Sequence, residues 1–73
     1  MINTNDLTFN SKTLTFTGKI AQGLCDFSDY LGVFVKSAKT GMIVEFDFIR
    51  YNGTSEVYEA NVNGKVITVV LEA

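Results

Sequence analysis

The sequence predicts a two-layer α+β domain, in which one helix packs on an antiparallel sheet and the element order is β-β-α-β-β-β. Three observations lead to this prediction. Segments near both ends of the chain alternate apolar and polar residues, which is the period of a half-buried strand. Between them, residues 26–40 carry apolar side chains at helical spacing. An Asn-Gly pair at positions 63 and 64 separates two C-terminal strands and is typical of a two-residue hairpin turn.

The N-terminal part of the chain predicts a hairpin. Apolar and polar residues alternate from Leu7 to Phe9 and again from Leu14 to Phe16, and the polar residues 10–13 between them suit a turn. We expect Phe9 to lie opposite Leu14 and Leu7 opposite Phe16. This pairing would place all four apolar side chains on one face of the sheet.

The middle of the chain, residues 26–40, predicts the helix. Asp26 can cap its N-terminus and Gly41 can end it. The apolar stripe of this helix would pack on the sheet. Its members are Phe27, Tyr30, Leu31, Phe34, Val35 and Ala38.

A strand is the competing interpretation of the same segment. Gly32 is unfavourable inside a helix, and Val33 and Val35 are β-branched. A strand over residues 30–36, followed by a turn over residues 37–41, would satisfy these preferences. The alternative fold class is then a small all-β barrel or sandwich.

The C-terminal half predicts a three-stranded meander formed by residues 42–50, 57–62 and 65–71. A type I′ turn at Asn63-Gly64 would pair Val62 with Lys65. The apolar residues of the last two strands then share one face, which we expect to be the core face. They are Tyr58, Ala60, Val62, Ile67, Val69 and Leu71.

The connection between the first two strands of the meander decides which residues face each other. A two-residue turn at Asn52-Gly53 would move the row that contains Phe46 onto the wrong face, because a one-residue slip inverts every side chain. We therefore expect a loop of odd length over residues 51–53. This loop sets Phe46 opposite Tyr58 and, on the other face, Glu45 opposite Glu59.

Acidic residues are concentrated in this meander. Five acidic and two basic residues follow position 41, whereas three acidic and four basic residues precede it. The simplest interpretation of these acidic residues is that they lie on a sheet face exposed to solvent. Because apolar residues share this face, we favour a surface that binds a protein with a basic surface, with Arg50 and Tyr51 as anchors at its rim. The expected binding residues are Ile43, Glu45, Asp47, Ile49, Arg50, Tyr51, Glu59 and Val66.

Composition excludes several classes of function. The chain has no His and one Cys, so it has no Ser-His or Cys-His catalytic pair and no internal disulfide. The net charge is −2 and the six cations form no run, which disfavours nucleic acid as a partner. No loop has a metal-ligand spacing, and no apolar run could span a membrane. We expect neither an enzyme nor a cofactor, and the lone Cys25 suits the reducing cytoplasm.

These expectations combine into one functional hypothesis for a single domain over residues 1–73. The protein would be non-catalytic and would act by stoichiometric binding of another macromolecule. One concrete form is an inhibitor of a host protein, of the kind that phages and mobile elements encode, which uses the acidic and apolar sheet face. The alternative is a structural assembly component that forms homo-oligomers, with a homodimer joined through the open sheet face.

Overall fold

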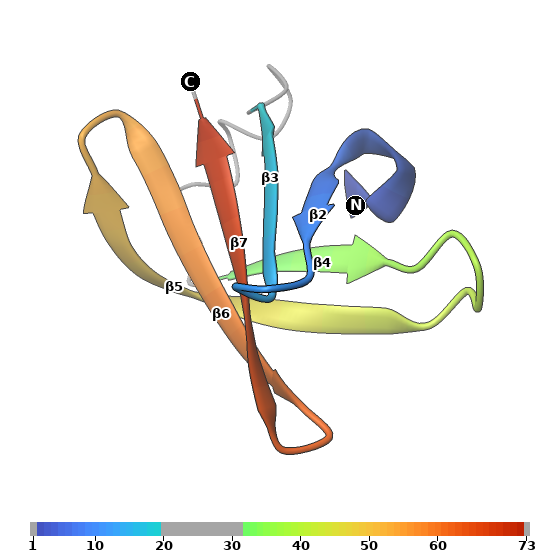
Figure 1. Ribbon diagram of the computed structural model, residues 1–73. Coiled ribbons are helices and arrows are strands. Elements are labelled where there is room, and N and C mark those ends of the chain that lie inside the picture. The colour runs from blue at the N-terminus through green and yellow to red at the C-terminus, as the bar shows by residue number, and fades with distance from the viewer. Residues whose placement is uncertain (1, 20–31, 73) are drawn as a thin grey trace.

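The computed structural model describes residues 2–19 and 32–72, which form one seven-stranded mixed sheet with the order β1-β4-β5-β6-β7-β3-β2. Figure 1 shows the sheet curling into an open half-barrel, with β4 and the first part of β5 running across the direction of β6 and β7. One turn of 3-10 helix, η1 (Thr4–Asp6), is the only helix among the described residues. The strands are β1 (Ile2–Asn3), β2 (Thr8–Asn10), β3 (Thr15–Lys19), β4 (Gly32–Lys36), β5 (Ile43–Asn52), β6 (Ser55–Val62) and β7 (Lys65–Glu72).

The predicted helix over residues 26–40 is wrong where the structure describes this segment, and with it the α+β fold class. Residues 32–36 form β4, which pairs with β5 in the antiparallel direction. Val33 and Val35 are buried whereas Phe34 between them is 51% exposed, which is the alternation of a strand. The structure matches the all-β alternative more closely. Residues 26–31 lie outside the described residues.

Gly32 lies at a close approach between β4 and β5. A Cβ atom at this position would lie 2.5 Å from the backbone oxygen of Phe46 on β5. Real Cβ atoms do not approach backbone so closely, so only glycine lets β4 and β5 meet here. The residue that weakens a helix is therefore a requirement of the observed strand pairing.

The C-terminal hairpin has the predicted register. Val62 lies opposite Lys65, Ala60 opposite Ile67 and Tyr58 opposite Val69. Asn63 and Gly64 both have positive φ angles, 53° and 81°, as a type I′ turn requires. The Asn61 Oδ1 atom also accepts a hydrogen bond from the Gly64 N–H group at 3.1 Å.

The predicted loop over residues 51–53 is wrong, because a β-bulge replaces it. The strands β5 and β6 are joined through Gly53 and Thr54, a connection of even length. The register then shifts by one residue between Phe48 and Arg50, so that Ile49 is the extra residue. The bulge returns the apolar side chains to the core face. The pairs on its two sides are Phe48 with Tyr58 and Asp47 with Glu59, and Arg50 with Val57 and Tyr51 with Glu56.

The N-terminal segment pairs with both halves of the curled sheet. β1 pairs with β4 in the parallel direction, and after η1 the strand β2 pairs with β3, which itself runs parallel to β7. The predicted hairpin is present, but Phe9 lies opposite Phe16 and not opposite Leu14. The Ala38 N–H group donates to Thr4 Oγ1 at 2.9 Å and ties η1 to the turn after β4. The two parallel pairings were not predicted.

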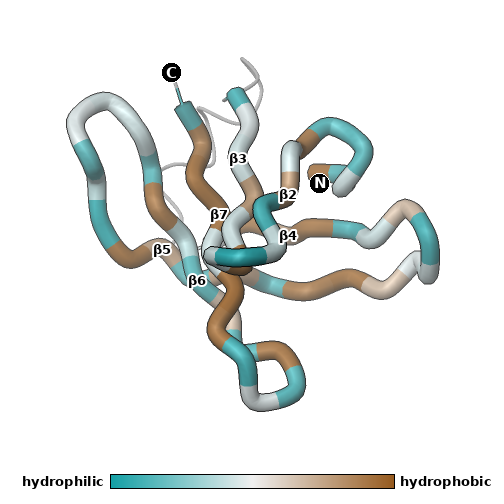
Figure 2. The backbone as a smooth tube through the Cα atoms, viewed as in Figure 1, coloured by the Kyte–Doolittle hydropathy of each residue, from teal (hydrophilic) through white to brown (hydrophobic). Residues whose placement is uncertain are grey.

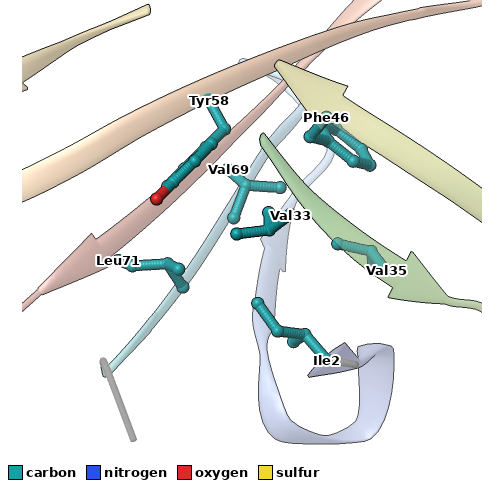
Figure 3. Packing of buried hydrophobic residues seen from close by; sticks show 7 residues of the cluster. All are labelled: Ile2, Val33, Val35, Phe46, Tyr58, Val69 and Leu71. Carbon is teal, nitrogen blue, oxygen red and sulfur yellow. The ribbon is translucent and has the colours of Figure 1, made fainter. Parts of the chain in front are cut away.

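The core lies on the concave face of the sheet, which we call the inner face. Seven buried residues from five strands converge there in Figure 3. Figure 2 shows that β7 is apolar along most of its length, as expected for a strand with neighbours on both sides. The seven residues are Ile2, Val33, Val35, Phe46, Tyr58, Val69 and Leu71.

Candidate functional site

The side chains that point away from the core form a second surface on strands β4 to β7, which we call the outer face. Its central position is Asp47, which lies between Gly32 on β4 and Glu59 on β6. Along the chain, β5 lies beside β4 up to this residue and beside β6 from it onward, so that the strand joins the two halves of the half-barrel (Figure 1). The outer face consists of Phe34, Lys36, Ile43, Glu45, Asp47, Arg50, Val57, Glu59, Asn61, Val66, Thr68 and Val70. Val57 is the buried member of this set.

The pair of opposed carboxylates on this face differs from the predicted one. Glu45 was expected opposite Glu59, but the structure places Asp47 there and sets Glu45 opposite Phe34 on β4. The turn lies at residues 53–54, further along the chain than predicted, and the bulge then shifts the register by one residue. Together the two changes move β5 by two residues along β6 relative to the predicted register. A shift of two keeps every side chain on its predicted face and changes only its neighbour.

Asp47 and Glu59 are acidic neighbours without a cation directly across the sheet. The other cross-strand neighbour of Asp47 is Gly32, and that of Glu59 is Thr68. Directly opposed residues bring their Cβ atoms to about 5 Å, and like charges at this distance destabilise a sheet. Asp47 is exposed and Glu59 is half-buried, so both carboxylates remain accessible to a partner.

Large apolar side chains lie beside these acids. Phe34 is 51% exposed and faces Glu45, and Ile43 is 48% exposed and faces Lys36. Val66 is also exposed, but it lies opposite Asn61 near the β6–β7 turn. Apolar and acidic residues are therefore interleaved on β4 and β5. Phe34 was assigned to the core by the helical interpretation, and the alternation of Val33 and Val35 was the signal for its exposure.

Arg50 and Tyr51 do not form the joint anchor that the sequence suggested. Arg50 faces Val57 and Tyr51 faces Glu56, so the two side chains point to opposite faces of β5. The Tyr51 ring packs edge-on against Phe48 with centroids 5.0 Å apart. Tyr51 therefore belongs to the inner face, and Arg50 alone remains on the outer face.

A buried polar pair on the inner face was missed by the sequence analysis. Glu56 is 6% exposed, and its Oε1 atom accepts a hydrogen bond from the Tyr58 hydroxyl at 2.7 Å. Burial, together with this bond to a carboxylate, raises the pKa of Tyr58 above its ordinary value of 10.0. The signal was available, because Glu56 precedes Tyr58, Ala60 and Val62 at the spacing of the core face.

No protein-family model, curated protein or solved structure matches the chain. Within residues 2–19 and 32–72, no helix is long and apolar enough to cross a membrane. In the same part of the chain, no group of three or more His, Cys, Asp or Glu residues is placed to hold a metal ion. The candidate function therefore follows from the outer face itself, where two acids lie opposed beside exposed apolar side chains.

Proposed function

We propose that the protein binds a basic surface of another protein stoichiometrically through the outer face, without catalysis. The observation that carries this proposal is the opposition of Asp47 and Glu59, with no cation across either strand. A Lys or Arg side chain from a partner, placed between the two carboxylates, would replace repulsion by attraction. Charge complementarity of this kind sets the specificity and the rate of association more than the affinity.

Affinity in this proposal comes from the apolar neighbours. Phe34 and Ile43 are each about half exposed beside the acids, and burying them removes apolar surface from water. Glu45 extends the acidic row next to Phe34. Ile49 and Val66 are also exposed and would extend the contact with a larger partner.

In a narrower form of this proposal, the protein is an inhibitor that occupies a basic surface of a host protein. Phages and mobile elements encode inhibitors of this kind. A small chain with a net charge of −2 can compete with a polyanion for such a surface. We place this activity in the reducing cytoplasm, which suits the single Cys25 of the chain.

The alternative, a homodimer through the outer face, is opposed by the same acids. A two-fold interface brings one patch against its own copy. With Asp47 and Glu59 at the centre of the patch, the axis would pass near them and bring the same two acids of the second chain close. Such a dimer would form more readily at high salt, where the repulsion is screened. Light scattering at low and high salt measures this directly, and a stable dimer at low salt would contradict the proposal.

The test is capture of a partner from a lysate of the source organism, compared between two charge-matched variants. Asp47→Lys with Glu59→Lys reverses the opposed acids, whereas Asp6→Lys with Glu72→Lys makes the same change of net charge elsewhere. We expect the first variant to lose the captured protein and the second to retain it. Equal retention by both variants would overturn the proposal, and equal loss would show attraction by net charge alone.

A further inference from the structure

A hollow of about 370 Å³ lies on the side of the molecule where the N-terminal segment joins the two edges of the sheet. It is formed by η1 and β2, by Phe16 on β3 and by the turn after β4. These segments are far apart in the sequence and are held together by the hydrogen bond from Ala38 N–H to Thr4 Oγ1. The residues that line it are Thr4, Asn5, Leu7, Phe9, Phe16, Ser37, Ala38 and Lys39.

The apolar wall of the hollow is an incompletely covered part of the inner face. Phe9 lies opposite Phe16, which lies opposite the fully buried Val69, so Phe9 belongs to the inner face. It is nevertheless 44% exposed. The rings of Phe9 and Phe16 are tilted by 41° with centroids 4.5 Å apart. A further aromatic ring could pack against this pair, at the offset or tilted geometry that aromatic groups prefer.

The polar part of the lining has one sign of charge. Lys39 is the only charged residue among those that line it, and no carboxylate is present. Asn5 and Ser37 also line the hollow and carry an amide and a hydroxyl group. The volume lies at the lower end of the range for small-molecule sites, which also combine apolar walls with a few polar groups.

We propose that this hollow binds a small aromatic anion, with its ring against Phe9 and Phe16 and its anionic group at Lys39. The hollow shares no residue with the outer face, so this inference does not depend on the proposed binding of a basic protein. Aromatic packing supplies the contact area, and the ammonium group selects the anion over a neutral compound of the same shape.

The experiment is a titration of the ¹⁵N-labelled protein with naphthalene carboxylate, followed by the backbone amide resonances. We expect saturable shifts confined to residues 4–9, 16 and 37–39. Naphthalene methanol, the neutral analogue, should bind roughly two- to fivefold more weakly, as expected for the loss of one exposed ion pair. Shifts that do not saturate, or that map to other strands, would overturn the proposal.

Two variants with a matched control locate the site. Lys39→Gln should weaken binding of the carboxylate to the level of the neutral analogue, whereas Lys12→Gln, in the exposed β2–β3 turn, should leave it unchanged. Phe9→Thr should abolish the shifts of both compounds, and the amide spectrum of the variant reports whether the fold is retained. If Lys39→Gln and Lys12→Gln bind the carboxylate equally, the ligand class is wrong.

Discussion

The Tyr58 hydroxyl donates a 2.7 Å hydrogen bond to the Glu56 carboxylate, and both side chains are buried on the inner face. The two residues are two positions apart on β6, so they point the same way and meet above the sheet. A buried carboxylate is costly unless donors satisfy it. The tyrosine therefore lets an acidic residue occupy a core position at the end of the half-barrel.

Replacing Tyr58 by Phe should lower the free energy of unfolding. The ring is retained, but Glu56 loses the hydrogen bond that the Tyr58 hydroxyl donates, and removing a donor from a buried carboxylate costs about 1–3 kcal/mol. Urea denaturation measures this loss. The control is Tyr51→Phe, whose hydroxyl belongs to a residue that is 60% exposed, and a change below about 0.5 kcal/mol is expected. Equal losses in the two variants would contradict the role of the hydrogen bond.

Alkaline pH should destabilise the protein through Tyr58. Its pKa is raised in the folded state by burial and by the bond to Glu56, so above pH 10 the unfolded chain releases this proton more readily. Stability from this group is complete below pH 10 and falls as the pH rises beyond it, by up to about 1.4 kcal/mol per pH unit. Urea midpoints across this range should fall faster for the native protein than for Tyr58→Phe. If the urea midpoints of the two proteins fall in parallel with pH, Tyr58 is not the source of the alkaline destabilisation.

Two glycine variants should differ in stability because of what a Cβ atom would meet. At Gly32 it would meet the backbone oxygen of Phe46, which cannot move without separating β4 from β5. At Gly18 it would meet the end of the Leu7 side chain, which can change rotamer. Gly32→Ala should therefore lose at least about 1–3 kcal/mol, the usual cost of overpacking, and Gly18→Ala should lose less. The reverse order in thermal or urea unfolding would contradict the close approach of β4 to β5.

The register of β5 on β6 predicts which acid interacts with Glu59. Changing Asp47 to Lys should stabilise the fold by roughly 0.2–1 kcal/mol through a cross-strand ion pair, and high salt should reduce the gain. Changing Glu45 to Lys should not stabilise the fold in this way, because Glu45 faces Phe34 and not Glu59. Double-mutant cycles that combine each change with Glu59→Gln measure whether Glu59 is coupled to position 47 or to position 45. Coupling of Glu59 to position 45 and not to position 47 would show that the predicted register was correct.

The features that follow from local chemistry could be predicted from the sequence. Asn63-Gly64 can adopt two positive φ angles, so the turn and the register of β6 on β7 follow from it. The alternation around Phe46 requires one extra residue between β5 and β6. The pattern does not say whether the connection or the strand holds that residue, and the structure places it at Ile49. For this reason Asp47 and Glu59 were placed on the correct face but given the wrong neighbours.

The features that depend on distant parts of the chain could not be predicted. The spacing of Phe34, Val35 and Ala38 fits a helix, whereas the β-branched Val33 and Val35 favour a strand. The close approach of Gly32 to the backbone of Phe46 is a contact between segments distant in the sequence, which the local pattern does not contain. The parallel pairing of β3 with β7 leaves no local signal, because its partners are more than fifty residues apart in the sequence. The hollow beside Phe9 depends on the same long-range closure.

The parallel pairing of β3 with β7 also determines when this protein can fold during synthesis. Thr15 to Lys19 pair with Thr68 to Glu72, so β3 has no partner on that side until the last of these residues has left the ribosome. The β6–β7 hairpin is local and can form as soon as it emerges, but closure of the half-barrel has a high contact order and is expected to be slow. A nascent chain that ends before residue 68 would expose Phe16 and Val33 together. In that interval the chain would depend most on chaperones that bind apolar segments.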